Sequence, residues 1–270
     1  MSMIKQFYKE ELEFTGPYAR GENSEGKAEA IQEWLNLNKN YIKGWDPNLL
    51  MDDDFGVGTE KALIAWQQKV CVGADPGVVD EDTWNKLVQP LLDAFTVTHE
   101  SFTSVRDLIL YYCEQHLAGI AQEVGSNEGP WVRSYMGGND GKQWAWCMGF
   151  AQTMLDQAYS TVGRKFTDIM PLTYSCDIVG EHGLKTKALI CNADLRKLDG
   201  ISEKVKPGDL FLIVKTEHDW VHTGIIEKVK GDILHTIEGN TNDEGSREGY
   251  ELCRRKRNFR KSNIDVFVIS

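Results

Sequence analysis

Residue types that perform nucleophilic catalysis occur in an order that one α-helix and one β-hairpin can bring together. Cys147 follows the Trp-Ala-Trp of residues 144–146 and starts an apolar stretch with helical spacing. The positive end of a helix stabilises a thiolate, which lowers the pKa of a cysteine placed there. His222 lies in an apolar segment typical of a strand, where an imidazole can take the thiol proton and later protonate a leaving amine. The pattern predicts a Cys–His pair for acyl transfer.

Glu238 and Asn240 are the candidates for a third catalytic residue. The Lys-Gly-Asp of residues 230–232 predicts a tight turn between a strand at 221–229 and the strand that ends at these two residues. The hairpin would return Glu238 beside His222, and the alternation of side chains along a strand would turn Asn240 to the same face. A carboxylate or an amide behind the imidazole would hold it in one tautomer. We favour Glu238 for this role and keep Asn240 as the alternative or supporting residue.

Two tryptophans flank the proposed pair in sequence. Trp146 precedes Cys147 and Trp220 lies two residues before His222. Aromatic faces stack on sugars and peptides, so we expect Trp146 and Trp220 to line the substrate groove. The basic run of residues 254–257 is interpreted instead as an exposed connection into the last strand.

A metal or cofactor site is not expected. None of the six cysteines forms a C-x-x-C pair, so the spacing of a zinc site is absent. The Asn-Asp-Gly of residues 139–141 offers one carboxylate, which is too few for a calcium ion that prefers six or more oxygen ligands. Most of the cysteines are interpreted as buried, unreactive thiols.

The elements that must position these residues predict an α+β fold. Apolar residues at helical spacing predict helices at 105–117 and 144–159, and Gly-rich residues 122–141 separate them. Strand patterns follow at residues 208–214, 221–229, 233–237 and 264–269. Helices followed by a consecutive run of strands favour an antiparallel sheet. The long segment 163–201 between the two parts is expected to cover or reshape the substrate groove.

A separate unit of three short helices precedes this part of the chain. Apolar stripes around Trp34, Trp66 and Trp84 predict the helices, with Thr59 as the N-cap of the second and Asp80 or Asp82 as the N-cap of the third. We place the first domain at residues 20–95 and the second at residues 100–270. A 70-residue helical unit is near the lower limit of independent stability.

The helical unit resembles the bacterial peptidoglycan-binding domain. The resemblance rests on Ile-Gln-Glu-Trp-Leu at 31–35, Asp-Phe-Gly-Val-Gly-Thr-Glu-Lys-Ala at 54–62, Gly-Val-Val-Asp at 77–80 and Thr-Trp-Asn-Lys-Leu at 83–87. It implies a three-helix module that binds the cell wall, with peptidoglycan as the partner.

The second part is similar to the CHAP family of cysteine amidases and peptidases, which belong with the NlpC-type and papain-like hydrolases. The matching blocks are Trp-Ala-Trp-Cys-Met-Gly-Phe at 144–150, Pro-Gly-Asp-Leu at 207–210, Val-His-Thr-Gly-Ile at 221–225 and Thr-Ile-Glu-Gly-Asn-Thr at 236–241. The resemblance implies Cys147 as nucleophile, His222 as general base and acid, Glu238 as the residue that orients it and Asn240 in support. It also implies an oxyanion donor at the backbone amide of Cys147.

Composition excludes several other functions. With 41 acidic against 30 basic residues, the net charge of −11 disfavours nucleic-acid binding and repels anionic lipid headgroups. No apolar run approaches the ~20 residues of a membrane span, so membrane insertion is not expected. The first 16 residues lack the plan of a secretory signal, so we expect synthesis in the cytoplasm and holin- or secretion-system-mediated delivery to the wall.

These observations predict a peptidoglycan hydrolase that cleaves an amide bond, either as an N-acetylmuramoyl-L-alanine amidase or as a stem-peptide endopeptidase. Its biological setting would be that of a phage endolysin or of a type VI secretion effector, the latter with an immunity protein as partner. Two alternatives remain at this stage. One is an inactive wall-binding or phage structural protein, and the other is a cysteine protease that acts on proteins.

Overall fold

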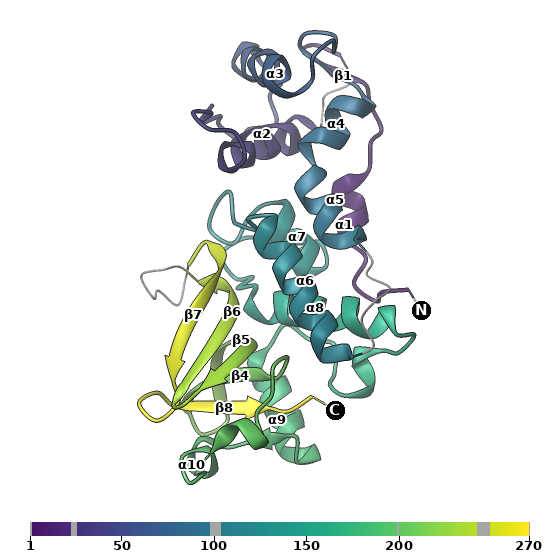
Figure 1. Ribbon diagram of the computed structural model, residues 1–270. Coiled ribbons are helices and arrows are strands. Elements are labelled where there is room, and N and C mark those ends of the chain that lie inside the picture. The colour runs from purple at the N-terminus through teal and green to yellow at the C-terminus, as the bar shows by residue number, and fades with distance from the viewer. Residues whose placement is uncertain (1, 23–25, 98–103, 199, 242–248, 270) are drawn as a thin grey trace.

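The chain folds into a helical unit near its N-terminus and an α+β domain with an antiparallel sheet, as expected (Figure 1). The computed structural model describes residues 2–22, 26–97, 104–198, 200–241 and 249–269. In Figure 1 the helical unit lies at the top and the sheet at the lower left. Within the described residues no helix combines the length and the apolar composition needed to cross a membrane.

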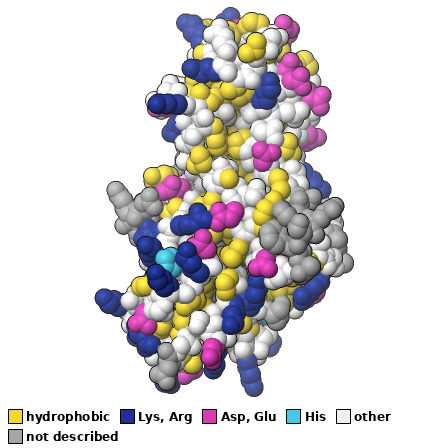
Figure 2. Space-filling model, in the orientation of Figure 1, with side chains coloured by type: hydrophobic (Ala, Val, Ile, Leu, Met, Phe, Trp, Pro, Cys, Tyr) yellow, Lys and Arg dark blue, Asp and Glu magenta, His cyan; other side chains and the backbone are white. Residues whose placement is uncertain are grey.

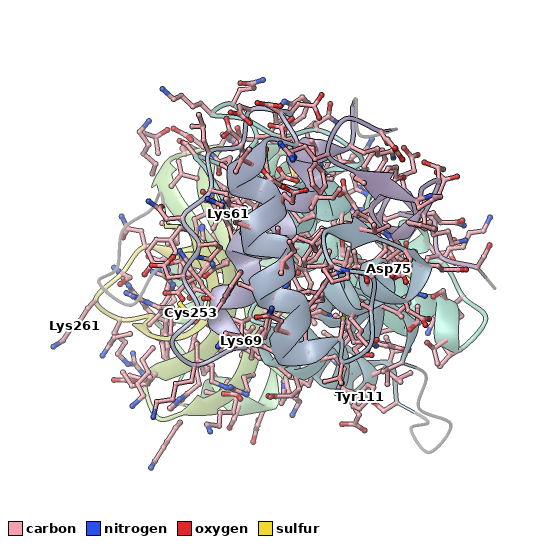
Figure 3. The ribbon with its side chains drawn as sticks, turned by 90° about the horizontal axis from the view of Figure 1, so that it is seen from above. Lys61, Lys69, Asp75, Tyr111, Cys253 and Lys261 are labelled. Carbon is pink, nitrogen blue, oxygen red and sulfur yellow. The ribbon has the colours of Figure 1, made fainter. Side chains whose placement is uncertain are left out.

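The helical unit is built from α2 (Ala28–Leu37), α3 (Val57–Val70) and α4 (Glu81–Leu87), with the short helix η1 (Asn38–Asn40) after α2. Trp34 and Trp66 are fully buried between these helices, and Trp84 is almost so, because each lies on the apolar stripe of its own helix. Asp80 caps α4, as predicted, by accepting a hydrogen bond from the Thr83 backbone N–H at 2.8 Å. Viewed from above, Lys61 and Lys69 mark α3 along the top of the molecule (Figure 3).

The prediction that Thr59 caps the second helix is wrong. Helix α3 begins two residues earlier, and its N-cap is Gly56 in an extended conformation. The Thr59 hydroxyl instead accepts a hydrogen bond from the Gln32 side chain of α2 at 3.1 Å. Thr59 therefore joins α2 to α3 inside the unit.

The N-terminal segment and α5 lie beside the α+β domain. Helix α1 (Tyr8–Leu12) contacts α5 (Gln89–Thr96) and α7 (Pro130–Met136), and α5 packs on α6 (Val105–Ala118). Pro90 stands in the first turn of α5, where a missing N–H costs no helical hydrogen bond. Strand β1 (Tyr18–Ala19) pairs with β2 (Val78–Val79) and ties the start of the chain to the helical unit.

Over the residues that the structure describes, the sheet of the second domain has six strands in the order β3-β8-β4-β5-β6-β7. Their bounds are β3 Leu189–Ile190, β4 Leu210–Thr216, β5 Asp219–Lys230, β6 Ile233–Thr241, β7 Glu251–Asn258 and β8 Ile264–Phe267. The predicted hairpin is present, with β5 and β6 antiparallel and Lys230 opposite Ile233. Helix α8 (Cys147–Thr161) packs on β5 and β6, and a second apolar cluster around Phe211 and Leu195 covers the other face.

Residues 254–257 form half of strand β7 (Glu251–Asn258) and are not the exposed connection predicted from their charge. The backbone pairs with β6 along most of its length. Arg254 and Lys256 lie on the outer face, where they join Lys228 and His235 around a shallow pocket. Lys and Arg side chains gather in this part of the surface in Figure 2. The strand was missed because long polar side chains hide the alternation that identifies a strand.

The long segment 163–201 contains ordered elements of its own. After the short helix η2 (Phe166–Asp168) come α9 (Cys176–Thr186), β3 and α10 (Asn192–Leu195), followed by η3 (Ile201–Glu203). Helix α9 packs on β5, the strand that carries the predicted histidine. The segment therefore packs on the strand of the proposed site, and its role in shaping a substrate groove stays a prediction.

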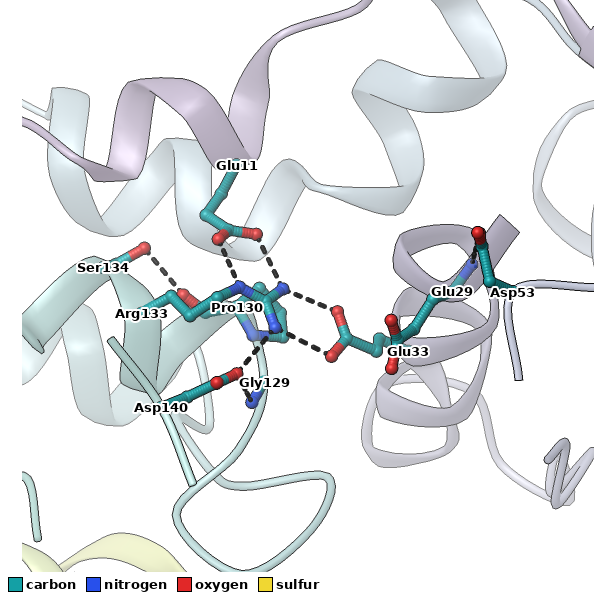
Figure 4. Close-up of polar contacts among 9 residues, drawn as sticks. All are labelled: Glu11, Glu29, Glu33, Asp53, Gly129, Pro130, Arg133, Ser134 and Asp140. Atoms are coloured by element: carbon teal, nitrogen blue, oxygen red, sulfur yellow. Dashed lines mark hydrogen bonds and ion pairs between the residues drawn. The ribbon is translucent and has the colours of Figure 1, made fainter. Parts of the chain in front are cut away.

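One arginine joins the helical unit to the α+β domain (Figure 4). Arg133 on α7 bonds Glu11 of α1 at 2.6 Å, Glu33 of α2 at 2.6 Å and Asp140 at 3.0 Å. The Glu11 and Glu33 side chains are only 8% and 4% exposed, so both depend on this guanidinium for their counter-charge. Three carboxylates from three segments thus meet on one side chain.

We expect Arg133→Met to destabilise the protein by about 3–5 kcal/mol, because it leaves two buried carboxylates unpaired. Urea unfolding of the variant beside the wild type measures this loss. Lys197→Met is the matched control, since the Lys197–Asp194 pair is exposed and such pairs add little. Equal unfolding midpoints for Arg133→Met and the wild type would contradict the role assigned to the cluster.

Candidate active site

Cys147 is the first residue of α8, the position predicted from the sequence. The N-cap residue Trp146 offers no side-chain acceptor, so the first backbone N–H groups of the helix have no side-chain cap. The start of α8 lies directly against β6. A Cβ added at Gly239 would stand only 2.5 Å from the Trp146 ring and 3.1 Å from Phe150 Cβ. Glycine at 239 thus permits the close approach of α8 and the sheet.

The hairpin brings Glu238 to His222 as expected from the turn. Ile225 stands opposite Ile237, so Glu238 comes beside Gly224 and diagonal to His222. His222 Nε2 lies 2.8 Å from Glu238 Oε2. A Cβ at Gly224 would approach Glu238 Cγ to 2.8 Å, so the small residue leaves room for the carboxylate.

Glu238 is fully buried and its two oxygens have further partners. The Thr236 hydroxyl donates to Oε1 at 2.5 Å and the Arg257 Nε donates to the same oxygen at 2.7 Å, while Arg257 Nη2 bonds Oε2. The Arg257 guanidinium also lies over the Phe211 ring, 5.0 Å from its centroid. Sequence reasoning missed Arg257, because its role depends on the pairing of β7 with β6.

The side chains of Cys176 and His222 and the backbone of Thr223 lie close enough to Cys147 to lower the pKa of its thiol. With Nε2 of His222 directed at Glu238, the other ring nitrogen, Nδ1, is left for the thiol. Cys176 is the first residue of α9 and is buried. Its position beside Cys147 was also missed. A Ser before an amphipathic stretch, here Ser175, was the local signal for a helix start at this point.

The groups of the site shift one another's pKa values. The hydrogen bond from Cys176 and the neighbouring His222 outweigh burial and lower the pKa of Cys147 well below its usual value. Burial alone would lower the pKa of His222, but its bonds to Cys147 and Glu238 raise it to about 9. Burial would raise the pKa of Glu238, whereas His222 and Arg257 hold it at about 2. These shifts favour a thiolate beside an imidazolium, with a carboxylate behind the ring.

Asn240 lies apart from this chain of hydrogen bonds. The β6–β7 ladder shifts register between Glu238 and Thr241, and Asn240 has a φ of 56°, so the regular alternation of the strand fails there. With its amide nitrogen turned to the nearby acceptors, Asn240 donates to Glu123 and Asn127 at 3.2 and 3.1 Å. Neither of these partners is His222, and Glu238 is the residue behind the imidazole.

Trp146 and Trp220 do not line a groove, contrary to the expectation from their positions. Trp146 is fully buried, stacks on Tyr135 and donates its Nε1–H to Glu123 at 2.7 Å. Trp220 is 5% exposed and donates its Nε1–H to Asp265 at 2.8 Å. Both rings serve the packing around the site, since Trp146 lies against Tyr135 and Gly239, and Trp220 lies against Gly180 of α9.

Asp140, the one carboxylate considered for calcium, is bound to protein groups. It pairs with Arg133 at 3.0 Å and accepts the Gly129 backbone N–H at 3.4 Å. Among the residues that the structure describes, no three His, Cys, Asp or Glu side chains converge as a set of metal ligands.

Comparison with known proteins identifies the helical unit and not the second domain. Residues 24–87 match the family model of the peptidoglycan binding domain. Neither the curated proteins nor the solved structures contain a match to the chain. The match supports association with the cell wall and peptidoglycan as a partner.

Arg257→Met should make the reactivity of Cys147 more sensitive to acid. Without the guanidinium the pKa of Glu238 rises from about 2, and a protonated carboxyl no longer stabilises the imidazolium. Alkylation of Cys147 by iodoacetamide, followed by peptide mass spectrometry, slows as the pH falls. We expect this decline to begin at a higher pH in the variant than in the wild type. A shift of about one pH unit corresponds to a tenfold lower rate on the acid limb.

Lys256→Met is the control for this measurement, since Lys256 is the exposed neighbour on the same strand. Its profile should coincide with that of the wild type. An unshifted profile for Arg257→Met would show that the arginine does not act through Glu238. The lowered pKa also has a stability consequence, because the contribution of ionised Glu238 is present above pH 4.5 and disappears as the pH falls towards 2.

Proposed function

We propose that the protein is a peptidoglycan hydrolase that cleaves an amide bond of the bacterial cell wall through a covalent thioester on Cys147. The observation that carries the proposal is the placement of Cys147 at the start of α8 beside His222, whose imidazole is hydrogen-bonded to Glu238. The resemblance of this domain to the CHAP cysteine amidases and peptidases agrees with the same three residues. The match of residues 24–87 to the peptidoglycan binding domain supports the choice of substrate.

Acylation begins from the thiolate. The Cys147 sulfur attacks the carbonyl carbon of the amide, and the electron pair of the C=O bond moves to oxygen. The backbone N–H of Cys147 at the uncapped helix start can donate to this oxyanion. His222, held as an imidazolium by Glu238, then gives its proton to the departing amine as the C–N bond breaks.

Deacylation uses the same residues in the opposite sense. The neutral imidazole of His222 takes a proton from water, whose oxygen attacks the thioester carbonyl. The C–S bond breaks, a carboxylate product leaves, and Cys147 and His222 return to the ion pair. Glu238 keeps the ring in place through both steps, because Thr236 and Arg257 fix both of its oxygens.

The helical unit would hold the enzyme on its polymeric substrate. A wall-bound module raises the local concentration of the second domain near scissile bonds, and the Arg133 cluster keeps the two parts together. The site of action that follows from this proposal is the cell wall. A lysin of phage origin and a secreted antibacterial toxin with an immunity partner are both consistent with that site.

Digestion of purified sacculi tests the proposal. The reduced wild-type protein should release soluble fragments, and mass spectrometry of the new amino termini names the bond. A free amine on the first alanine indicates the amidase, and an amine within the stem indicates an endopeptidase. Cys147→Ala should lower the rate by at least about 10³-fold, and Glu238→Gln by about 10²-fold.

Cys191→Ala is the matched cysteine control, since Cys191 precedes α10 and is not a member of the catalytic chain. It should digest sacculi like the wild type. Binding of intact sacculi by both the wild type and Cys147→Ala, without any release, would replace the hydrolase with a binding protein. Cleavage of a protein substrate with untouched sacculi would identify a protease instead.

A further inference from the structure

Two helices present a cysteine at their first residue, and the two starts meet. Cys147 begins α8, which is 15 residues long, and Cys176 begins α9, which is 11 residues long. Ser175 caps α9 through a hydrogen bond from the Ile178 backbone N–H at 3.4 Å. Each sulfur therefore lies at the positive end of a helix, where a thiolate is stabilised.

The start of α9 is fastened to both elements that carry the catalytic pair. Gln152 on α8 donates to the Pro171 carbonyl at 2.8 Å and accepts from the Thr173 N–H at 3.1 Å. On the other side, Asp177 accepts the Trp220 backbone N–H of β5 at 2.6 Å. Contacts of residues on both sides of Cys176 thus hold the start of α9 against α8 and β5.

The side chain of Cys176 is a close neighbour of Cys147 and is the strongest of the groups that lower the pKa of its thiol. Cys147 is 5% exposed and Cys176 is 7% exposed, so both lie just below the surface. A thiol is a weak hydrogen-bond donor, and a hydroxyl at position 176 would stabilise a thiolate at least as well. What a thiol adds is the ability to form a covalent bond to the neighbouring sulfur.

We infer that Cys147 and Cys176 form an oxidation site, in which Cys176 resolves oxidised Cys147 as a disulfide and so stores the nucleophile in a recoverable form. The inference rests on the proposed function for its biological meaning, because the disulfide would switch the hydrolase off. Where a hydroperoxide reaches the enzyme, the disulfide would hold it inactive until a dithiol reductant acts on it.

The chemistry balances with a hydroperoxide as oxidant. The Cys147 thiolate attacks one oxygen of hydrogen peroxide, the O–O bond breaks, and a sulfenic acid and hydroxide form. The Cys176 thiolate then attacks the sulfenyl sulfur and expels hydroxide, which takes up the proton of the Cys176 thiol to give water. The two thiols have lost two electrons, and the peroxide has gained them. Closure brings the sulfurs to about 2 Å, which requires rotation of the side chains at the two helix starts.

Peptide mass spectrometry under non-reducing conditions tests this directly. The wild type is treated with hydrogen peroxide, blocked with iodoacetamide and digested with protease. We expect a cross-linked peptide that joins Cys147 to Cys176, disappears with dithiothreitol, and forms in step with the loss of sacculus digestion. The Cys176→Ser variant should lack it and carry Cys147 as sulfinic acid, which dithiothreitol does not reverse.

Cys191→Ser serves as the matched control and should form the cross-link like the wild type. Alkylation of Cys147 in reduced Cys176→Ser verifies that this variant is folded around its nucleophile. Sulfinic acid at Cys147 in the wild type, at the rate seen in Cys176→Ser, would overturn the inference. The cross-link is measured without substrate, so its formation in a protein that leaves sacculi intact would refute the proposed function alone.

Discussion

The Glu238 carboxylate is completely buried in the sheet, and an isolated charge in that place would be strongly unfavourable. It persists because three donors surround it, namely His222, Arg257 and the Thr236 hydroxyl. Cys147 and Glu238 together raise the pKa of His222, and Cys176 and His222 lower the pKa of Cys147. The chemistry proposed for the sulfur thus depends on a carboxylate that the sheet holds in place. Strands β5, β6 and β7 are the elements that do so.

Buried charge pairs also join the helical unit to the second domain. Glu11 from the N-terminal segment and Glu33 from the helical unit share Arg133 of the second domain. The start of the chain is held further along α8, where Asp156 accepts the backbone N–H groups of Ile4 and Lys5 at 2.7 Å. The wall-binding unit is therefore coupled to the domain that carries the candidate site by several contacts beyond the chain connection.

Local patterns were sufficient for the parts of the site that one helix and one hairpin create. The apolar periodicity after Cys147 and the turn between β5 and β6 are both short-range signals, and they led to His222 and Glu238. Predictions of side-chain direction and exposure failed where the backbone conformation or the burial departs from the regular pattern of a helix or strand. A bulge with positive φ redirects Asn240, and close packing encloses the rings of Trp146 and Trp220.

Long-range pairing accounts for what was missed. Arg257 reaches Glu238 only because β7 returns beside β6, and the basic composition of β7 gives no strand signal. Cys176 reaches Cys147 only because Gln152 and Asp177 hold the start of α9 against α8 and β5. Neither contact follows from spacing along the chain. The peptidoglycan-binding unit, in contrast, is carried by continuous motifs, and its resemblance agrees with the family match.

The ionisation of His222 tests the proposed Cys147–His222 ion pair most directly. Nitrogen chemical shifts of its imidazole, followed by NMR across neutral and alkaline pH, should give a pKa of about 9 in the wild type. In Cys147→Ala the thiolate is lost while the burial remains, so the pKa should fall. An imidazole that titrates near its ordinary value of 6.5 in both proteins would contradict the ion pair on which the proposed chemistry rests.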